Sequence, residues 1–127
     1  MNARRVNANT RDTGSRWEDA VLAHLQRAGL TLIARNFTCR YGEIDLIMRD
    51  RDQIAFIEVR YRGADAHGGG TESVGAGKQA KLARAAAVYL QHNPALAAMT
   101  CRFDVVGCSG APVKAVFDWT RGAFDAF

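Results

Sequence analysis

Two acidic residues lie inside runs of the sequence that otherwise read as buried β-strand. Asp45 lies in Gly42–Ile47, and Glu58 lies in Phe56–Arg60. An unpaired carboxylate is costly in an apolar layer, so each of these residues should have a compensating partner. The polar segment Arg49–Asp52 lies midway between the two runs and predicts a turn. We therefore interpret the two runs as a β-hairpin.

The register of this hairpin decides whether the two carboxylates meet. A turn centred between Arg51 and Asp52 places Asp45 directly opposite Glu58 on one face. Opposed Cβ atoms lie about 4.5–5.5 Å apart, and like charges at that distance repel. Mg²⁺ takes oxygen ligands and commonly uses one or two carboxylates, so a bound divalent cation would relieve the repulsion. A slip of one residue would instead turn the two side chains to opposite faces.

The same register adds two charged residues to this face. Glu43 lies opposite Arg60, and Arg60 shares a face with Glu58 because side chains alternate along a strand. The spacing leaves two interpretations open. The cluster is either a metal site or a charged patch at the exposed end of a sheet, held by a pair between Glu43 and Arg60.

Several short motifs, taken in order, resemble a known family. Asp45 followed by Glu58-Val59-Arg60 resembles the Asp…Glu-x-Lys signature of the restriction-endonuclease-like nucleases, the PD-(D/E)xK superfamily. More closely, the chain resembles the YraN-like family of small bacterial proteins, which is grouped with that fold and is distantly similar to Holliday-junction resolvases. The likeness extends from about Trp17 to Phe127. It rests on Ala34–Phe37, Gly42–Ile47, Phe56–Arg60, Lys78–Gln79 and Arg102–Val106.

The resemblance implies an α/β fold with a restriction-endonuclease-like core, in the order αβββαβ, whose central mixed sheet is flanked by helices. It also implies a nuclease that hydrolyses phosphodiester bonds in DNA, branched or single-stranded, with Mg²⁺ or Mn²⁺ as cofactor. Asp45 and Glu58 would then be metal ligands, and the backbone carbonyl of Val59 would be a third. Glu18 matches a first-helix glutamate that assists metal binding in the resolvase-like members. Alternatively, Glu18 completes a capping box that begins at Ser15.

Position 60 departs from the superfamily pattern, because it carries arginine where lysine is expected. Arginine stays protonated and cannot act as a base, although its planar guanidinium can bind phosphate. The nucleophile would then be generated at the metal site, or by Glu18 or Glu43 acting through water. The departure also leaves a second function open, namely a non-catalytic DNA-binding or adaptor module that has kept the shape of the site.

Further candidates lie at and after the start of the second predicted helix. Lys78 and Gln79 are expected either to position water or phosphate, with Gln79 as a catalytic candidate, or to be ordinary surface residues. Lys78, Lys81 and Arg84 recur at three-residue steps along one exposed face, where they contact phosphate or only solvent. Asp104 is a further candidate, and its alternative role is to pair with a neighbouring arginine.

The composition of the chain fits one compact domain, since 48% of its 127 residues are hydrophobic. A formal charge of +4 favours an anionic partner, which we take to be nucleic acid. The three cysteines form no Cys-x-x-Cys pair, and no signal-peptide segment is evident, so we expect a cytoplasmic protein with reduced thiols. No apolar run reaches membrane-spanning length, and no membrane partner is expected. The oligomeric state stays open, a homodimer included.

The pattern of apolar residues and turn formers predicts the order of elements. Residues 1–13 should be a flexible basic tail, and residues 14–127 the single endonuclease-like domain. A first helix should begin at Ser15, bury Trp17, Val21, Leu25 and Ala28, and end at Gly29. The remaining elements should be strands near 30–39, 41–48 and 53–62, a flexible glycine-rich loop over 63–77, a helix over 76–91, and strands over 101–108 and 113–119.

Overall fold

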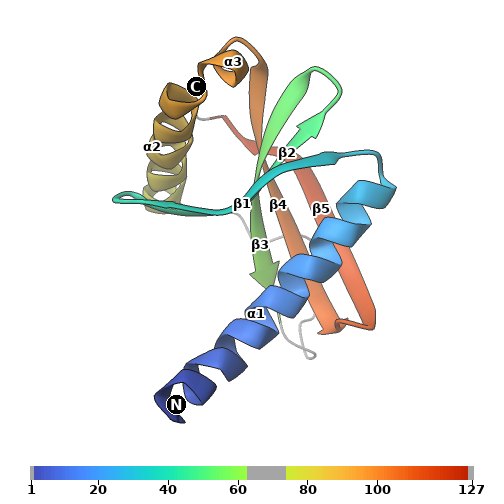
Figure 1. Ribbon diagram of the computed structural model, residues 1–127. Helices are drawn as coiled ribbons and strands as arrows, with labels where there is room; N and C mark the ends of the chain where they lie inside the picture. Colours follow the sequence, from blue (N-terminus) through green and yellow to red (C-terminus); the bar gives the residue numbers. More distant parts are fainter. Residues whose placement is uncertain (1, 63–73, 126–127) are drawn as a thin grey trace.

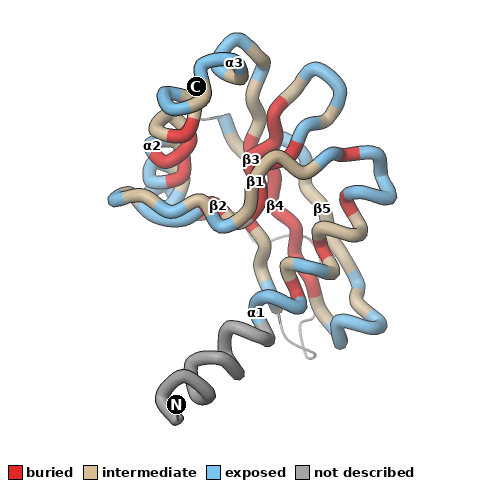
Figure 2. The backbone as a smooth tube through the Cα atoms, in the orientation of Figure 1, coloured by how far each residue is buried: buried red, intermediate tan, exposed pale blue. Residues whose placement is uncertain are grey.

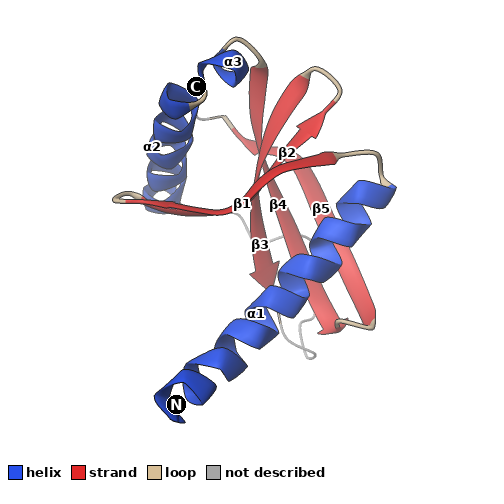
Figure 3. Ribbon diagram, in the orientation of Figure 1, coloured by secondary structure: helices blue, strands red, loops and turns tan. Residues whose placement is uncertain are grey.

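The structure is a computed structural model that describes the backbone of residues 2–62 and 74–125 and the side chains of residues 14–62 and 74–125. It contains a five-stranded mixed sheet flanked by helices, as predicted (Figure 3). The elements in chain order are α1 (Asn2–Arg27), β1 (Thr31–Cys39), β2 (Gly42–Asp50), β3 (Gln53–Tyr61), α2 (Ala76–His92), α3 (Pro94–Ala97), β4 (Thr100–Ala111) and β5 (Lys114–Phe124).

The strands lie in the sheet in the order β1-β2-β3-β4-β5. Neighbouring strands are antiparallel except for β3 and β4, which are parallel and are connected through the segment that contains α2. Figure 1 shows α1 crossing the sheet, while α2 lies apart from α1 beside the β1–β2 hairpin. The two long helices therefore approach the strands from different sides.

Each face of the sheet has its own hydrophobic core. In β3, Ile54 and Phe56 pack in the cluster with α2, whereas Ala55 and Ile57 pack in the cluster with α1. Because β3 is covered on both faces, its sequence is a nearly continuous apolar run rather than an alternating one. Figure 2 shows this buried stretch along β3 and β4 at the centre of the sheet. Glu58 lies at the end of that run.

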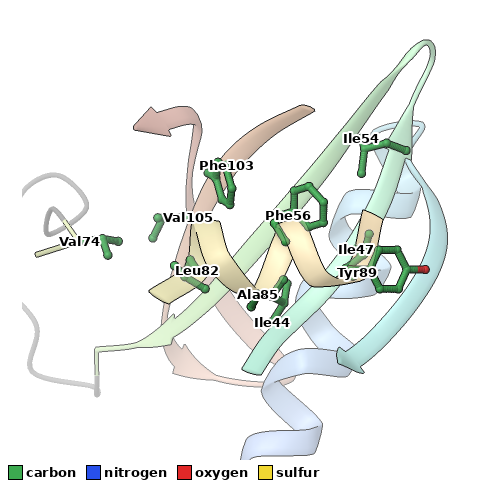
Figure 4. Packing of buried hydrophobic residues seen from close by; sticks show 11 residues of the cluster. Ile44, Ile47, Ile54, Phe56, Val74, Leu82, Ala85, Tyr89, Phe103 and Val105 are labelled. Carbon is green, nitrogen blue, oxygen red and sulfur yellow. The ribbon is translucent and has the colours of Figure 1, made fainter. Parts of the chain in front are cut away.

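Helix α2 packs one face on the sheet and leaves the other exposed. Leu82, Ala85 and Tyr89 recur at helical spacing and contact the core around Phe56 (Figure 4). The alanine-rich sequence favours a helix, and the predicted stop is confirmed at Asn93, which precedes a proline and whose Nδ2 donates to the carbonyl of Tyr89 at 2.8 Å. The exposed face is therefore free to carry charged side chains.

Helix α1 begins earlier than predicted. Its backbone is helical from Asn2, so Ser15 lies inside the helix and the predicted capping box is wrong. No proline interrupts the sequence before Ser15, and a helix that is already nucleated gains one hydrogen bond for each residue added. The flexibility predicted for residues 1–13 concerns a segment whose side chains lie outside the described residues, and it stays a prediction.

The predicted apolar stripe of α1 is confirmed over most of its length. Trp17, Val21 and Leu25 are buried against the sheet. Ala28 lies beyond the end of the helix and is exposed, because Gly29 turns the chain with a φ of 103°. Among the described residues, no helix is both long and apolar enough to cross a membrane.

The strands before α2 match the prediction closely, and those after it are longer than predicted. The short helix α3 was not predicted, and β4 and β5 extend to Ala111 and Phe124 because a tight connection joins them. Most of the predicted glycine-rich loop, residues 63–73, lies outside the described residues, and its last part belongs to α2 from Ala76 onward.

Candidate active site

The β2–β3 hairpin has the predicted register. Its ladder pairs Asp50 with Gln53 and continues to Leu46 and Ile57, and every pair has residue numbers that sum to 103. The ladder stops one step before Asp45 and Glu58. Beyond that point the carboxylate Oδ2 of Asp45 accepts a hydrogen bond from the backbone N–H of Val59 at 2.8 Å. The side chain of Asp45 therefore substitutes for a backbone acceptor where the two strands separate.

Three carboxylates converge at this separation. One carboxylate oxygen from each of Glu18, Glu43 and Asp45 lies within 4.8 Å of the others. Glu18 comes from α1, and the other two come from β2. Because Glu18 lies inside α1 rather than at its start, the capping role expected as the alternative for Glu18 is not found.

Arg35 on β1 holds Glu18 in place. Its guanidinium lies 3.4 Å from a carboxylate oxygen of Glu18 and donates to Asp19 at 2.8 Å. Arg35 belongs to one of the motifs that carry the family resemblance, but its spacing from Glu18 gave no signal of this contact. The pairing fixes the side of α1 that faces the carboxylate cluster.

Glu58 is paired with cations and is not one of the three carboxylates that converge within 4.8 Å. Its side chain is 8% exposed, and its Oε2 lies 2.7 Å from Nζ of Lys78 and 3.8 Å from Nε of Arg60. Lys78 is in the first turn of α2 and is half exposed. The sequence predicted Glu58 and Lys78 as site candidates but did not predict the contact between them.

A cavity of about 750 Å³ opens between β2, β3 and α2, and both kinds of charge line it. Its acidic lining residues are Glu43, Asp45 and Glu58, and its basic ones are Lys78 and Lys81. The remaining lining residues are Tyr41, Gly42, Val59, Gly77 and Leu82. Of the predicted site residues, Glu18, Arg60, Gln79 and Arg84 lie outside this lining.

Burial and neighbouring charge act together on Asp45. The pKa of Asp45 is raised from the ordinary 3.8 to about 8, chiefly by loss of hydration and in smaller part by the nearby carboxylates of Glu58, Glu18 and Glu43. The hydrogen bond from the N–H of Val59 acts in the opposite direction, because it favours the charged form. A proton or a cation is therefore expected on Asp45 near neutral pH.

This pKa predicts a pH dependence of the metal-free protein. Between about pH 4 and pH 8 the folded state holds a proton on Asp45 that the unfolded state has released, so the free energy of unfolding should fall as the pH rises. Replacing Asp45 with asparagine keeps an oxygen for the N–H of Val59 and removes the titration. Chemical denaturation in a chelator should therefore give a more negative slope against pH for the wild type than for Asp45→Asn. Equal slopes would contradict the raised pKa.

The predicted basic row lies on α2 as expected. Its three side chains, Lys78, Lys81 and Arg84, are all exposed and follow one another at intervals of three residues along α2. Gln79 makes a structural contact instead, because its Nε2 donates to the carbonyl of Val74 at 2.7 Å. That bond secures the chain at the start of α2, and a catalytic role for Gln79 stays a prediction.

Asp104 takes the structural role that was its alternative. It is 1% exposed, accepts hydrogen bonds from Arg102, from Nε1 of Trp119 at 3.1 Å and from the N–H of Gly122 at 3.0 Å, and does not line the cavity. Arg102 also donates to Asp50 at 2.9 Å. This network joins β4 and β5 to the β2–β3 hairpin.

Comparison with known proteins places this chain in a family. The model of a family described as "Uncharacterised protein family UPF0102" matches residues 17–108. The UPF0102 protein of Xylella fastidiosa (strain M12) is 46% identical over 116 residues, which cover 91% of this chain and 94% of the relative. The UPF0102 protein of Pseudomonas syringae pv. syringae (strain B728a) is 46% identical over 120 residues, with coverages of 93% and 98%. That of Xanthomonas oryzae pv. oryzae (strain PXO99A) is 50% identical over 113 residues, with coverages of 89% and 91%.

Proposed function

The chain belongs to the uncharacterised protein family UPF0102, the YraN family, and we propose that it is a divalent-metal-dependent nuclease that hydrolyses phosphodiester bonds in DNA. The observation that carries this proposal is one cavity with carboxylates and lysines in its lining. Carboxylates are suited to a hard divalent cation, and lysines to the phosphate of the substrate. A charged patch at the exposed end of a sheet, the alternative interpretation, would not require the carboxylate of Asp45 to lose its hydration.

The order of elements supports a restriction-endonuclease-like core. A helix, a three-stranded antiparallel meander, a second helix and a parallel strand follow one another, and β5 extends the sheet by one strand. Apart from the short α3, this order agrees with the order αβββαβ implied by the resemblance, and we propose that residues 14–127 form one domain. The cysteines Cys39, Cys101 and Cys108 are free thiols, which supports a reducing, cytoplasmic location.

The donor atoms around Asp45 fit a divalent cation. Glu18, Glu43 and Asp45 offer oxygens within 4.8 Å of one another, and Mg²⁺ and Mn²⁺ prefer such oxygen ligands. The resemblance gives an overlapping set, in which Asp45 is joined by Glu58 and the carbonyl of Val59. The first set leaves the ion pair between Lys78 and Glu58 intact, whereas the second has to exchange it. Asp45 is a ligand in both sets.

A divalent cation bound there would polarise the scissile phosphate and offset the charge that develops on it. The residues of the chain divide the remaining tasks. Lys78 and Lys81 reach the phosphate oxygens from α2. Glu58 holds the amine of Lys78 at 2.7 Å and so orients it toward the cavity. In the second ligand set, Glu18 and Glu43 are not ligands, and either of them is close enough to Asp45 to accept the proton of the attacking water.

Lys78 occupies the role that the superfamily pattern assigns to position 60. Arg60 does not line the cavity, whereas Lys78 does, and both contact the same carboxylate of Glu58. The lysine is thus supplied by α2 rather than by β3. Arg60 then holds Glu58 from the side of β3, which leaves the amine of Lys78 for the phosphate.

Arg60 also favours a second candidate function, which is a DNA-binding or adaptor module without catalysis. Arginine cannot act as a base, and a site that lost its lysine would keep its charge and shape. The two functions differ in one result. The adaptor should bind DNA with or without a divalent cation and cut none.

Metal binding should be visible as a gain in stability. A cation that binds only the folded state stabilises it by mass action, by about 2.7 kcal/mol at a concentration of 100 times the dissociation constant. Mg²⁺ or Mn²⁺ should therefore raise the melting temperature of the wild type, and Asp45→Asn should abolish the rise. Differential scanning fluorimetry with and without metal measures both.

Three further variants make the thermal test specific. Asp52→Asn alters an exposed carboxylate in the β2–β3 turn and should leave the metal response unchanged. A response lost in Glu43→Gln indicates the first ligand set, and one lost in Glu58→Gln indicates the second. A response that persists in Asp45→Asn would reject the proposed site.

A further inference from the structure

A second cavity lies beside the first, and Tyr41 lines both. It has a volume of about 550 Å³ and is lined by Cys39, Arg40, Tyr41, Arg84, Ala87, Val88 and Gln91. We propose that this cavity is a subsite for an unpaired nucleotide of the DNA strand that is cut, whose base stacks on Tyr41. The inference rests on the proposed function and deepens it, because it specifies which DNA the site accepts.

The cavity is formed where the β1–β2 turn approaches the outer side of α2. Arg40 and Tyr41 are the two residues between β1 and β2, and Arg84, Ala87 and Val88 are on α2. Figure 1 shows the end of this hairpin extending to α2. The two-residue turn therefore places the ring of Tyr41 in the lining of the cavity beside α2.

Two arginines fix the ring of Tyr41. The guanidinium carbons of Arg40 and Arg84 lie 4.8 Å and 5.7 Å from the ring centroid, and Nη2 of Arg40 donates to the hydroxyl of Tyr41 at 2.6 Å. An aromatic ring among cations is the combination by which proteins bind single-stranded nucleic acid, with bases stacked on rings and phosphates held by charge.

The charge of the second cavity differs from that of the first. Three carboxylates line the first cavity, whereas the described residues that line the second include two arginines and no acidic residue. The second cavity is therefore suited to the anionic strand itself rather than to a cation. Charge complementarity favours an anionic occupant, and the proposed function makes that occupant the DNA strand.

The basic row of α2 leads from one cavity to the other. Lys78 and Lys81 line the first cavity, and Arg84, one step further along the same helix face, lines the second. Residues three apart on a helix have Cβ atoms about 5–6 Å apart, so long cationic side chains can follow consecutive phosphates of one strand. The strand would pass from the scissile phosphate at Lys78 along α2 to the ring of Tyr41.

This path restricts the substrate. A base that stacks on a protein side chain has left its partner in the duplex, so the nucleotide held at Tyr41, a short distance along the strand from the cut, must be unpaired. Single strands, frayed ends and branch points meet this condition. A continuous duplex does not.

The competing explanation is that Arg40 and Arg84 only tether the hairpin to α2 through the ring. Binding in a chelator separates the two explanations without any cleavage. The probes are a short single-stranded DNA and the same DNA with an abasic site placed at each position in turn. An RNA of the same sequence shows whether the subsite also accepts a ribonucleotide.

We expect Tyr41→Leu to weaken binding of the intact strand by about fivefold to about 150-fold, and Tyr41→Phe to retain it. One abasic position should weaken binding to the wild type and make it insensitive to Tyr41→Leu. Arg84→Gln should reduce the slope of log affinity against log salt by about one for intact and abasic DNA alike. The control is Tyr61→Leu, because Tyr61 is exposed but lines neither cavity, and it should bind as the wild type does.

An equal loss of affinity by Tyr41→Leu for intact and abasic strands would overturn the stacking subsite and favour the tether. Unchanged binding in Tyr41→Leu would also overturn it. Because these measurements need no metal, absence of cleavage by the wild type would reject the nuclease without deciding this test. A negative result in the binding test would in turn reject the stacking subsite without deciding whether the protein is a nuclease.

Discussion

Replacing Lys78 with methionine is expected to slow DNA cleavage about 10²- to 10³-fold, which is the loss measured when one donor to a developing anion is removed. Lys78 lines the cavity, and its amine lies 2.7 Å from Glu58, where the proposed function has it contact the scissile phosphate. Methionine keeps the length of the side chain and removes its charge. Single-turnover rates at saturating Mn²⁺ and protein measure the chemical step alone.

Two variants make the loss in Lys78→Met interpretable. Lys81→Met removes the next cation of the same cavity and should weaken binding while leaving the single-turnover rate largely intact. Adding Arg60→Lys to Lys78→Met should restore part of the rate, because Nε of Arg60 is 3.8 Å from the same carboxylate of Glu58. Full activity of Lys78→Met would contradict the role given to its amine.

The local parts of the site follow from the sequence. The register of the β2–β3 hairpin could be predicted because the turn at Arg51 and Asp52 has only two residues, which fixes the pairing of the strands on either side. The shared face of Asp45 and Glu58 followed from that register. The separation of the strands at Asp45 did not, because it depends on a side chain replacing a ladder hydrogen bond.

The contacts between distant segments did not follow from the sequence. Lys78 meets Glu58 because the crossover between β3 and β4 brings the first turn of α2 to the end of β3. Glu18 reaches the cluster because α1 is continuous through Ser15 and is held by Arg35. The periodicity of apolar residues within one element does not predict these contacts, since they depend on how separate elements pack.

The presence of a carboxylate in an apolar strand also did not distinguish a candidate site residue from a structural one. Asp45 and Asp104 are both carboxylates within apolar strands, and both were candidates. Asp104 is surrounded by donors from Arg102, Trp119 and Gly122, whereas Asp45 has neighbouring carboxylates and an open cavity. Part of these surroundings comes from distant segments, namely Trp119 and Gly122 on β5 for Asp104 and Glu18 on α1 for Asp45.

Replacing Asp45 with asparagine is expected to have the largest effect on activity. Asp45 belongs to both ligand sets, so the variant should lose the several kcal/mol of charge stabilisation that a bound cation supplies, which is a loss of about 10³-fold or more in rate. The fold should persist, because asparagine can accept the N–H of Val59 and the change removes repulsion from the neighbouring carboxylates. The loss would then report on chemistry and not on unfolding.

The most direct test of the central claim is cleavage of end-labelled single-stranded, flapped and four-way-junction DNA by the purified wild type and by Asp45→Asn, with Mn²⁺ and with a chelator. The wild type should cut DNA containing unpaired nucleotides only when Mn²⁺ is present, and Asp45→Asn should cut at least about 10³-fold more slowly while remaining folded. Equal cleavage by the two proteins, or binding of all three DNAs without cleavage of any, would contradict it.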